Sequence, residues 1–367
     1  MHPETLLQRI LQNWATSGQR PTEEEWQQLE AWELADAKRC QGLGIDVENI
    51  TEVLKTRSHL FEAVVGDIAP FPFTTLWHLW IPLAMQLAAR QKALGRPLIQ
   101  GILGGQGTGK TTMGRMLSLI LSHLGDRTLS LSIDDLYKTY GQRQQLRETD
   151  PRLIWRGPPG THDVDLGLQV LDRLKQTPPS GEDTTQFIEV PRFDKSAWQG
   201  AGDRTTPELV EVADIILFEG WFVGVRPVEE DIWANAPAPI ITEGDRAFAR
   251  DNNQRLQEYL PLWERLDSLI VLYPEDYRLS LAWRKQAEHE MINSGKSGMS
   301  DAQIEEFVRY FWQALHPELF IDPLIKNPAW VDLVIQINRD RSIGKVYRPN
   351  QETGFLREMS VSPPLIT

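Results

Sequence analysis

The segment GGQGTGKT, residues 104–111, constrains the fold more than any other part of the sequence. It matches the pattern G-x-x-x-x-G-K-[ST], in which a glycine-rich turn joins a strand to a helix and wraps around phosphate groups. The apolar run Leu98 to Leu103 precedes the turn, and apolar residues at helical spacing follow it as far as Gly125. The sequence therefore predicts a strand, a phosphate-binding loop and a helix, in that order.

The residue types in this loop suit nucleotide binding. Glycines allow successive backbone N–H groups to turn towards phosphate oxygens, and the helix N-terminus adds a partial positive charge. Lys110 is expected to reach the β- and γ-phosphates of ATP, and the Thr111 hydroxyl to bind Mg²⁺. The alternative, a glycine-rich turn without a ligand, is disfavoured by the flanking strand and helix. The predicted nucleotide-binding residues are Gly104, Gly105, Gln106, Gly107, Thr108, Gly109, Lys110, Thr111 and Thr112.

Further short apolar runs have the length of strands. They cover residues 128–133, 214–218, 268–273 and 331–337, and segments of helical character alternate with them. Strands that alternate with helices form a parallel sheet. We therefore expect an α/β fold with a doubly wound parallel sheet, occupying residues 96–345 and followed by a C-terminal tail at 346–367.

Residues 1–95 are predicted to form a helical N-terminal region. Thr22 precedes three glutamates and is typical of an N-cap with an acidic first turn. Apolar residues between Leu76 and Leu94 recur at helical spacing, so this helix should pack against the next domain. Residues 71–89 contain no charged side chain, but prolines and polar residues dilute the run. A buried helix is the better interpretation, and no membrane span is expected.

Composition excludes several classes of function. The net charge of −13 disfavours binding to a polyphosphate backbone, so nucleic acid is not an expected partner. Cys40 is the only cysteine, so neither an intrachain disulfide nor a cysteine-based zinc site can form. The N-terminus lacks the basic start and apolar run of a secretory signal, and we expect a cytoplasmic protein. No pattern in the sequence specifies an oligomeric state.

Carboxylates follow two of the predicted strands. Glu219 comes directly after residues 215–218, the position from which an acidic side chain can hold Mg²⁺ directly or through water. Asp134 and Asp135 follow the strand at 128–133, and either can orient and deprotonate an acceptor hydroxyl. Asp134 is favoured because it comes first. Each assignment has an alternative. For Glu219, it is a carboxylate that only caps the turn that follows its strand. For Asp134 and Asp135, it is a pair that only begins a helix as N-cap residues.

Several segments together resemble one family, the D-glycerate 3-kinases of the plant and cyanobacterial type. The segments are SIDDLY at 132–137, RG at 156–157, GTHD at 160–163, VPRFDKSA at 190–197, GDR at 202–204 and LFEGW at 217–221, and they occur in the family's order. The resemblance spans roughly residues 98 to 345, and the loop and strand-end Asp are shared with the wider phosphoribulokinase, uridine kinase and pantothenate kinase group. Leu136 departs from the aromatic residue usual at its position, and residues 1–95 match only loosely.

The resemblance implies a P-loop kinase core and a specific reaction. ATP would be the phosphoryl donor, Mg²⁺ the cofactor, D-glycerate the small-molecule substrate and 3-phosphoglycerate the product, within photorespiratory carbon salvage. Lys110 and Asp134 would be catalytic, and the expected metal-binding residues are Thr111, Glu219 and Asp134. After residue 274, a lid helix at about 275–293 carries Arg284 and Lys285, either of which could stabilise the transferring phosphoryl group. We favour Arg284; a solvated helix face is the alternative.

Glycerate carries a carboxylate, so its site needs cationic donors. Arg192 and Lys195 are the leading candidates, because charge-assisted hydrogen bonds hold carboxylates strongly. His162, Asp163, Asp194 and Arg204 are expected to bond the substrate or to support these cations, with ordinary surface charges as the alternative.

Two other functions remain open on the sequence. The first is a kinase for another small alcohol, such as a nucleoside or pantothenate. The second is a non-catalytic nucleotide-binding regulatory protein that uses its tryptophan-rich N-terminal region for docking. A switch protein should turn over ATP without an added acceptor, whereas a kinase should require one.

Overall fold

The computed structural model describes residues 3–67, 72–176, 187–295 and 298–349. At its centre is a six-stranded sheet in the order β10-β9-β8-β1-β7-β2. The pairs within β9-β8-β1-β7-β2 are all parallel, and β10 is antiparallel to β9. The strands are β1 (Leu98–Gly104), β2 (Thr128–Ser132), β7 (Ile215–Gly220), β8 (Ser268–Pro274), β9 (Leu333–Ile337) and β10 (Ile343–Tyr347).

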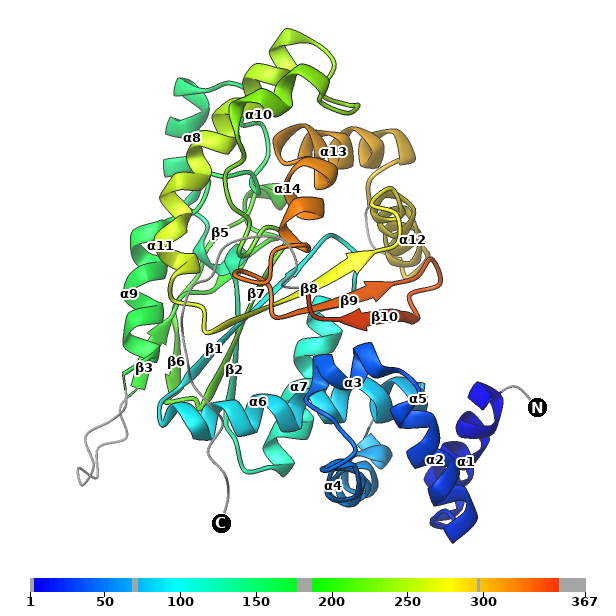
Figure 1. Cartoon of the computed structure of the whole chain (residues 1–367). Helices are drawn as coiled ribbons and strands as arrows, with labels where there is room; N and C mark the ends of the chain where they lie inside the picture. Colours follow the sequence, from blue (N-terminus) through cyan, green and yellow to red (C-terminus); the bar gives the residue numbers. More distant parts are fainter. Residues whose placement is uncertain (1–2, 68–71, 177–186, 296–297, 350–367) are drawn as a thin grey trace.

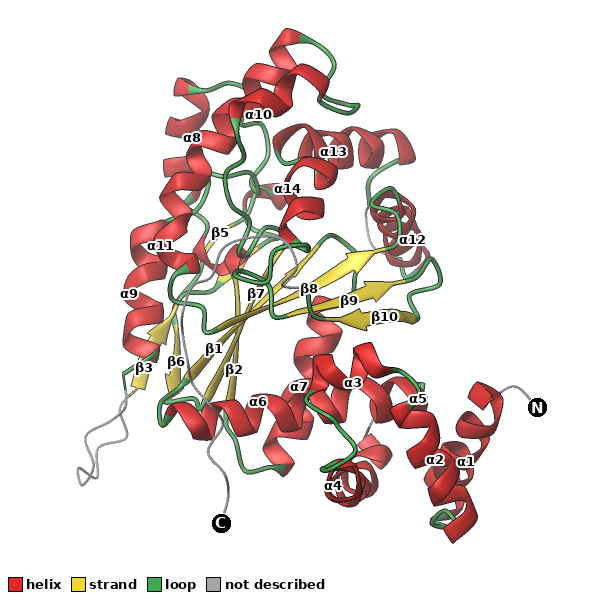
Figure 2. Ribbon diagram, in the orientation of Figure 1, coloured by secondary structure: helices red, strands yellow, loops and turns green. Residues whose placement is uncertain are grey.

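Helices cover both faces of this sheet (Figures 1 and 2). The N-terminal helices are α1 (Pro3–Ser17), α2 (Glu23–Leu34), α3 (Ala37–Leu43), α4 (Ile50–Val64), α5 (Phe73–Thr75) and α6 (Ile81–Leu94). The others are α7 (Lys110–His123), α8 (Tyr140–Thr149), α9 (Val164–Leu174), α10 (Glu243–Arg255), α11 (Leu260–Trp263), α12 (Leu279–Asn293), α13 (Asp301–Ala314) and α14 (Pro317–Leu324).

Short elements complete the chain. A π-helical segment, η2 (Leu76–Trp80), joins α5 to α6. The 3₁₀ turns are η1 (Val65–Asp67), η3 (Ile133–Leu136), η4 (Trp198–Gly200), η5 (Glu230–Asn235) and η6 (Leu256–Tyr259). Two small antiparallel ribbons pair β3 (Phe187–Val190) with β6 (Glu208–Glu211) and β4 (Phe193–Asp194) with β5 (Asp203–Arg204).

Alternation along the central strands divides the interior into two layers. In β1, Leu98 and Ile102 belong to the layer under α6 and α7, whereas Ile99 and Leu103 belong to the layer on the opposite face. Successive side chains of a strand point to opposite faces, so a strand covered on both sides reads as a continuous apolar run. This explains why the runs identified in the sequence are mainly apolar on both faces, with Gln100 as a buried polar exception in β1.

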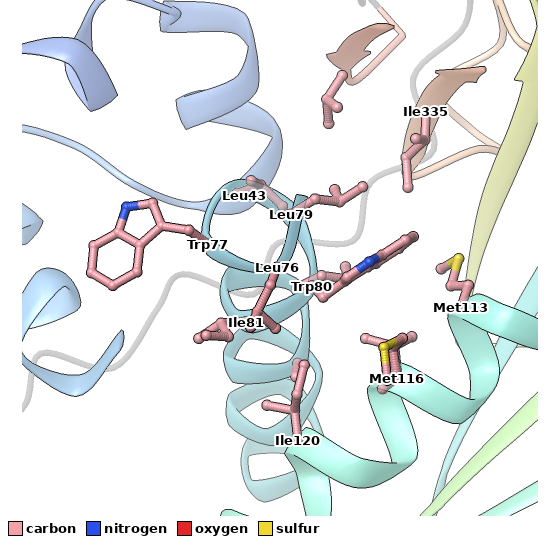
Figure 3. Packing of buried hydrophobic residues seen from close by; sticks show 14 of the residues in the cluster. Leu43, Leu76, Trp77, Leu79, Trp80, Ile81, Met113, Met116, Ile120 and Ile335 are labelled. Carbon is pink, nitrogen blue, oxygen red and sulfur yellow. The ribbon is translucent and has the colours of Figure 1, made fainter. Parts of the chain in front are cut away.

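The N-terminal helices share a core with the sheet. Buried side chains of α1 to α6 form one apolar cluster with α7, β9, β10 and the start of α12. Figure 3 shows Leu79 and Trp80 on the side of their helix that faces Met113, Met116 and Ile335, with Trp77 on the other side. The packing of this helix against the following domain is therefore confirmed.

The predicted fold class is confirmed: a mostly parallel sheet lies between helices, preceded by helices. Thr22 caps α2 through a capping box. The edge strand β10 and the two ribbons were not predicted, and β10 ends at Tyr347, two residues beyond the expected domain boundary at 345. Within the described ranges no helix is long and apolar enough to cross a membrane. The polar stretch around 178–185 lies outside the described residues, as does most of the predicted tail.

A buried ionic cluster lies between α2, α3, α4 and η2. Glu33 and Arg57 are both fully buried, and Arg57 Nη1 lies 2.8 Å from Glu33 Oε2. His78 Nδ1 lies 2.9 Å from the same oxygen, and Arg39 Nη1 lies 3.5 Å from Oε1. Burial alone would raise the pKa of Glu33, but Arg57, His78 and Arg39 together lower this pKa to about 2. The carboxylate is therefore ionised in the folded protein.

We predict that Glu33→Gln lowers the free energy of unfolding by about 3 kcal/mol, because removing one member of a buried ion pair leaves Arg57 buried without its counter-charge. Urea denaturation measures the difference. Glu62→Gln is the control, because Glu62 and its partner Arg20 are 33% and 60% exposed and the loss should be much smaller. Equal losses in the two variants would show that the buried cluster is not a special source of stability.

A second prediction concerns the stability of the folded protein at acidic pH. Burial lowers the pKa of His78 and of His162 to about 3, and that of His316 to about 4, so all three imidazoles stay neutral in the folded state. In the unfolded chain they take up protons near pH 6.5. Stability should therefore be complete above pH 6.5 and fall as the pH drops from 6.5 towards 4, with each imidazole adding up to about 1.4 kcal/mol per pH unit. Urea midpoints measured between pH 7.5 and 4.5 should show this decline, and a constant midpoint would contradict it.

Candidate active site

The phosphate-binding loop lies between β1 and α7, as the pattern predicts. Gly107 and Gly109 have φ angles of +78° and +89°, which side chains other than glycine rarely adopt. Gly104 is needed for space, because a Cβ atom there would lie 2.5 Å from the Thr108 hydroxyl oxygen. The loop is therefore shaped by its own glycines into a backbone cradle that fits a phosphate group.

Lys110 turns back over this cradle. Its Nζ donates hydrogen bonds to the carbonyl oxygens of Gly104 at 2.7 Å and Gly105 at 3.0 Å. Burial lowers the pKa of Lys110, while the carboxylates Glu219 and Asp134 act in the opposite direction. Because the buried Lys110 ammonium group has lost water, phosphate oxygens beside it would supply the missing hydrogen bonds. The group is therefore a strong partner for an anion. The position suits contact with ATP phosphates.

The metal-binding residues predicted from sequence converge on the same edge of the sheet. Glu219 lies in β7 between Ile102 of β1 and Ser132 of β2, and Thr111 is in the first turn of α7. The described residues contain no group of three or more His, Cys, Asp and Glu side chains suited to a metal ion. Mg²⁺ at a P-loop usually depends on one or two protein oxygens, phosphates and water, so this sparse oxygen set fits it.

The two aspartates after β2 occupy a single 3₁₀ turn, η3, and make different contacts. Asp135 accepts a hydrogen bond from the Ser132 N–H at 3.0 Å and pairs with Arg192 at 3.0 Å. Asp134 pairs with Lys195 Nζ at 2.6 Å, and this Asp134 side chain is 26% exposed. Asp135 therefore stabilises the turn, which is the role that the alternative of an Asp pair at a helix start gave it. Asp134 instead pairs with Lys195, a cation that is exposed to solvent.

The pKa values of the two carboxyl groups move apart. Burial raises the pKa of Asp135, and its contacts only partly offset that effect. Burial also raises the pKa of Asp134, but this effect is outweighed. The charge and hydrogen bond of Lys195 and a hydrogen bond from the Tyr137 hydroxyl lower the pKa of Asp134 overall. Paired carboxyl groups with opposite shifts are typical of sites where one of them does chemistry. Asp134 is the better candidate.

Tyr137, which hydrogen-bonds Asp134, is itself stacked on a buried histidine. The Tyr137 ring lies on the His162 ring with centroids 4.5 Å apart, and His162 Nδ1 lies 2.9 Å from the Tyr259 hydroxyl. That hydroxyl also accepts the Gly160 N–H at 2.9 Å. His162 has no exposed surface, and in this conformation its ring contacts Tyr137 rather than solvent; its predicted contact with substrate stays a prediction. Tyr137 and Tyr259 were not assigned roles from the sequence, although Tyr137 stands in the SIDDLY segment.

The remaining predicted substrate residues make structural contacts. Arg192 donates to Glu208 at 2.7 Å as well as to Asp135, so both edges of its guanidinium group are engaged. Arg204 pairs with Asp163 at 2.8 Å, and that Asp163 also caps α9. Asp194 accepts hydrogen bonds from Ser196 in its own turn. Direct contact of these four side chains with a substrate stays a prediction.

One cation near Asp134 was not assigned from the sequence. The guanidinium carbon of Arg156 lies 6.0 Å from the centre of the Tyr137 ring and 5.6 Å from that of Phe193. Its Nη1 donates to the Gly200 carbonyl at 2.6 Å. The RG segment at 156–157 is part of the family resemblance, but the sequence does not indicate which residues a single arginine in a loop will contact.

The helix predicted at about 275–293 is present as α12, which begins at Leu279, and its role as a lid stays a prediction. Trp283 packs on the phosphate loop so closely that a Cβ on Gly107 would lie 2.7 Å from the Trp283 Cβ. Arg284 pairs with buried Glu288 at 2.9 Å, and Lys285 pairs with Glu305 of α13. Arg284 would have to leave Glu288 to reach a phosphoryl group, so its catalytic role stays a prediction.

The chain is similar to proteins of known function. D-glycerate 3-kinase, chloroplastic, of Arabidopsis thaliana is 33% identical over 67% of this chain, and the match spans about half of that relative, 54% of its length. The solved D-glycerate 3-kinase of Cryptococcus neoformans is 31% identical over 72% of this chain and 96% of its own, with a TM-score of 0.64. A pantothenate kinase of Bacillus velezensis is 34% identical over 65% of this chain and 68% of its own. No protein-family model matches.

The parallel sheet, the phosphate-binding loop and the strand-end carboxylates define a P-loop kinase fold, and the solved structure shares it over nearly its whole length. More narrowly, the chain belongs to the family of the D-glycerate 3-kinases.

We predict that Lys110→Ala weakens binding of the Mg²⁺–ATP complex by roughly tenfold to a hundredfold and abolishes phosphoryl transfer, because a charge-assisted hydrogen bond of about 1.5 to 3 kcal/mol is lost. Calorimetric titration measures the affinity, and thermal unfolding without nucleotide shows that the fold is intact. Lys55→Ala, an exposed lysine on α4, is the control. Near-normal affinity and turnover in the Lys110 variant would remove the nucleotide site from this loop.

Proposed function

We propose that the protein transfers the γ-phosphoryl group of ATP to the 3-hydroxyl of D-glycerate, giving 3-phosphoglycerate. The observation that carries this proposal is the pair formed by Asp134 and Lys195, which sets an acceptor for a hydroxyl proton beside a cation for a carboxylate. Asp134 follows β2 at the edge of the sheet where β1 leads into the phosphate loop, and Lys195 reaches it from the turn after β4. Relatives named D-glycerate 3-kinase support the choice of acceptor. The proposal includes the predicted cytoplasmic location and a part in photorespiratory carbon salvage.

The nucleotide would be held mainly by backbone groups. Residues 104–112 would enclose the phosphates, and Lys110 would exchange its two carbonyl partners for β- and γ-phosphate oxygens. Thr111, Glu219 and Asp134 are the oxygen donors available for Mg²⁺, directly or through water. When bound, this ion would neutralise charge on the phosphates. Loop and ion together would leave the terminal phosphorus facing the acceptor.

Lys195 links substrate binding to the state of Asp134. The glycerate carboxylate and Asp134 would compete for the same ammonium group, since Lys195 is already paired at 2.6 Å. Drawing Lys195 towards the substrate would weaken the interaction that lowers the pKa of Asp134. Asp134 would then accept the proton of the 3-hydroxyl more readily, as that oxygen bonds to phosphorus and the bond to ADP breaks. In the absence of substrate, Lys195 would thus keep the Asp134 carboxylate less basic.

Arg192 and Arg284 complete the proposal in supporting positions. Arg192 can hold the turn that carries Asp134, because it pairs with Asp135 of the same turn. Arg284 would contribute after lid closure by leaving Glu288 for the transferring phosphoryl group. Tyr137 would orient Asp134 by its hydrogen bond, with His162 behind it.

Pantothenate is the rival acceptor with support of its own, since one relative is a pantothenate kinase. A regulatory nucleotide-binding protein is less well supported, because Asp134 and Lys195 have no task in simple binding of ATP. An assay of ATP consumption with and without D-glycerate, uridine and pantothenate separates the three. ATP turnover that needs no acceptor, or that needs an acceptor other than glycerate, would overturn the proposal.

The carboxylate contact can be tested at Lys195. Lys195→Gln should raise KM for D-glycerate by roughly tenfold to a hundredfold, because a charge-assisted hydrogen bond is lost, while KM for ATP changes little. Glycerol, which lacks the carboxylate, should be a poor substrate and lose little more in the variant. Arg192→Gln in the same assay shows whether Arg192 shares the contact: a comparable rise in KM for glycerate is expected if it does. An unchanged KM for glycerate in Lys195→Gln would assign the carboxylate to another cation.

The two aspartates can be separated by their effects. Asp134→Asn should lower kcat by on the order of 10²- to 10⁴-fold, the usual range for losing a positioned acid or base. Asp135→Asn should mainly lower stability, because it retains the turn geometry but loses its charge opposite Arg192. Steady-state rates and urea denaturation of both variants provide the comparison. A larger loss of kcat for the Asp135 variant would reverse the assignment.

A further inference from the structure

Two arginines that lack a carboxylate partner lie close together beside the proposed acceptor site. Arg143 belongs to α8 and Arg156 to the loop between α8 and α9, and their guanidinium carbons lie 5.1 and 5.6 Å from the centre of the Phe193 ring. Arg156 Nη1 donates to the carbonyl oxygen of residue 200 at 2.6 Å, and Arg143 Nη2 donates to those of residues 201 and 202 at 2.7 and 2.6 Å. Neither arginine forms an ion pair with a carboxylate of the described residues.

Neighbouring arginines differ, because carboxylates neutralise them. Arg192 lies 3.0 Å from Asp135, and Arg204 lies 2.8 Å from Asp163. An arginine that already holds a carboxylate must give it up before it can bind another one. Arg192 and Arg204 therefore have less to offer an anionic substrate than an arginine that bonds only to carbonyl oxygens.

The positive charge of the two unpaired arginines is compensated from a distance. Burial and then the like charge of Arg156 lower the pKa of Arg143, whereas Asp203 acts in the opposite direction. The Asp203 carboxylate already accepts the backbone N–H groups of residues 140 and 204 and the indole N–H of Trp198. Partly buried like charges are unfavourable unless an anion lies beside them. The pair therefore suits a ligand that brings negative charge.

The loop that follows Lys195 fixes the position of these arginines. Its backbone is left-handed at Trp198 and Gln199, with φ angles of +50° and +57°, which residues other than glycine rarely adopt. Such strain persists only where the surroundings hold it, and the arginine hydrogen bonds to residues 200–202 do so here. The loop thus sets Arg156 at a defined position relative to Lys195.

Arg156 also lies close to the residue that orients Asp134. Its guanidinium carbon is 6.0 Å from the centre of the Tyr137 ring. Burial and Asp134 raise the pKa of the Tyr137 hydroxyl, and the positive charge of Arg156 opposes that rise. Arg156 is partly exposed, and its Nε and Nη2 have no acceptor among the described residues. An anion held by these two nitrogens would therefore lie near Asp134.

We propose that Arg156 binds the carboxylate of the acceptor and thereby selects hydroxy acids over neutral alcohols. The inference rests on the proposed function and deepens it, because it assigns a specificity-determining residue to the same site. Nε and Nη2 form a planar fork that matches both oxygens of a carboxylate. Lys195 contacts one of these oxygens from the side of Asp134, while Arg143 adds positive charge and holds the loop.

D-glycerate and its amide, D-glyceramide, are acceptors that differ in the charge of one group, so they form a matched pair. Arg156→Gln should raise KM for D-glycerate by roughly tenfold to a hundredfold, because a charge-assisted contact is lost. KM for D-glyceramide should change by about twofold or less, since the amide brings no negative charge to Arg156. Initial rates at saturating ATP measure both. Equal rises for the two acceptors would show that Arg156 only supports the loop, and would overturn the inference.

Arg156→Lys separates the charge from the planar fork. It keeps a positive charge but loses the fork, so KM for D-glycerate should rise by at least about threefold and stay below that of the Gln variant. The Lys variant also decides the question if the Gln variant does not fold, because an unchanged KM in it would overturn the inference. Arg147→Gln is the control: Arg147 is exposed on α8, and its loss should leave KM for D-glycerate unchanged.

Failure of this specificity role and failure of the proposed function give different results. A parent enzyme that phosphorylates D-glycerate, with a KM that neither Arg156 variant changes, would overturn the inference and leave the function standing. A parent enzyme that uses a neutral alcohol but not D-glycerate would overturn both.

Discussion

Parallel pairing of β1, β7 and β2 is the constraint on which the site depends. Because these strands run in one direction, their carboxyl ends share one edge, and each delivers a different group there: the phosphate loop, Glu219 and the turn with Asp134. Strands buried on both faces cannot slip by one residue without moving apolar side chains into the wrong layer. The register that stabilises the interior therefore also fixes the spacing of the groups at its edge.

Sequence patterns were sufficient for the fold class and for the loop, because apolar runs and glycine positions are local signals. The proposed role of Asp134 also rests on a local signal, its place after a strand. The contact of Arg192 was not predictable in this way, because whether this cation faces a substrate or a carboxylate depends on Asp135, which is distant in the sequence. The same applies to His162, since nothing local indicates that a tyrosine will cover it. Arg284 and Glu288, by contrast, are four residues apart on one face of α12, so their spacing already indicated an ion pair.

The N-terminal helices contribute through packing. Their apolar residues complete the layer under α7, β9 and β10, and the start of α12 with Leu279 and Trp283 belongs to the same cluster. The ionic cluster around Glu33 sits within these helices and joins four of their segments, α2, α3, α4 and η2. The region is therefore part of the kinase core in physical terms, although the family resemblance lies almost entirely beyond it.

Contact between Trp283 and Gly107 has a consequence for observing the protein at work. The indole lies on the phosphate loop while its N–H donates to the Arg339 carbonyl at 3.1 Å, and the Arg341 guanidinium carbon lies 5.8 Å from its ring centre. Indole emission responds to nearby charge and to solvent. A chain in which this tryptophan alone keeps its fluorescence would report, by an optical signal without any attached dye, when nucleotide enters the loop and when the helix above it moves.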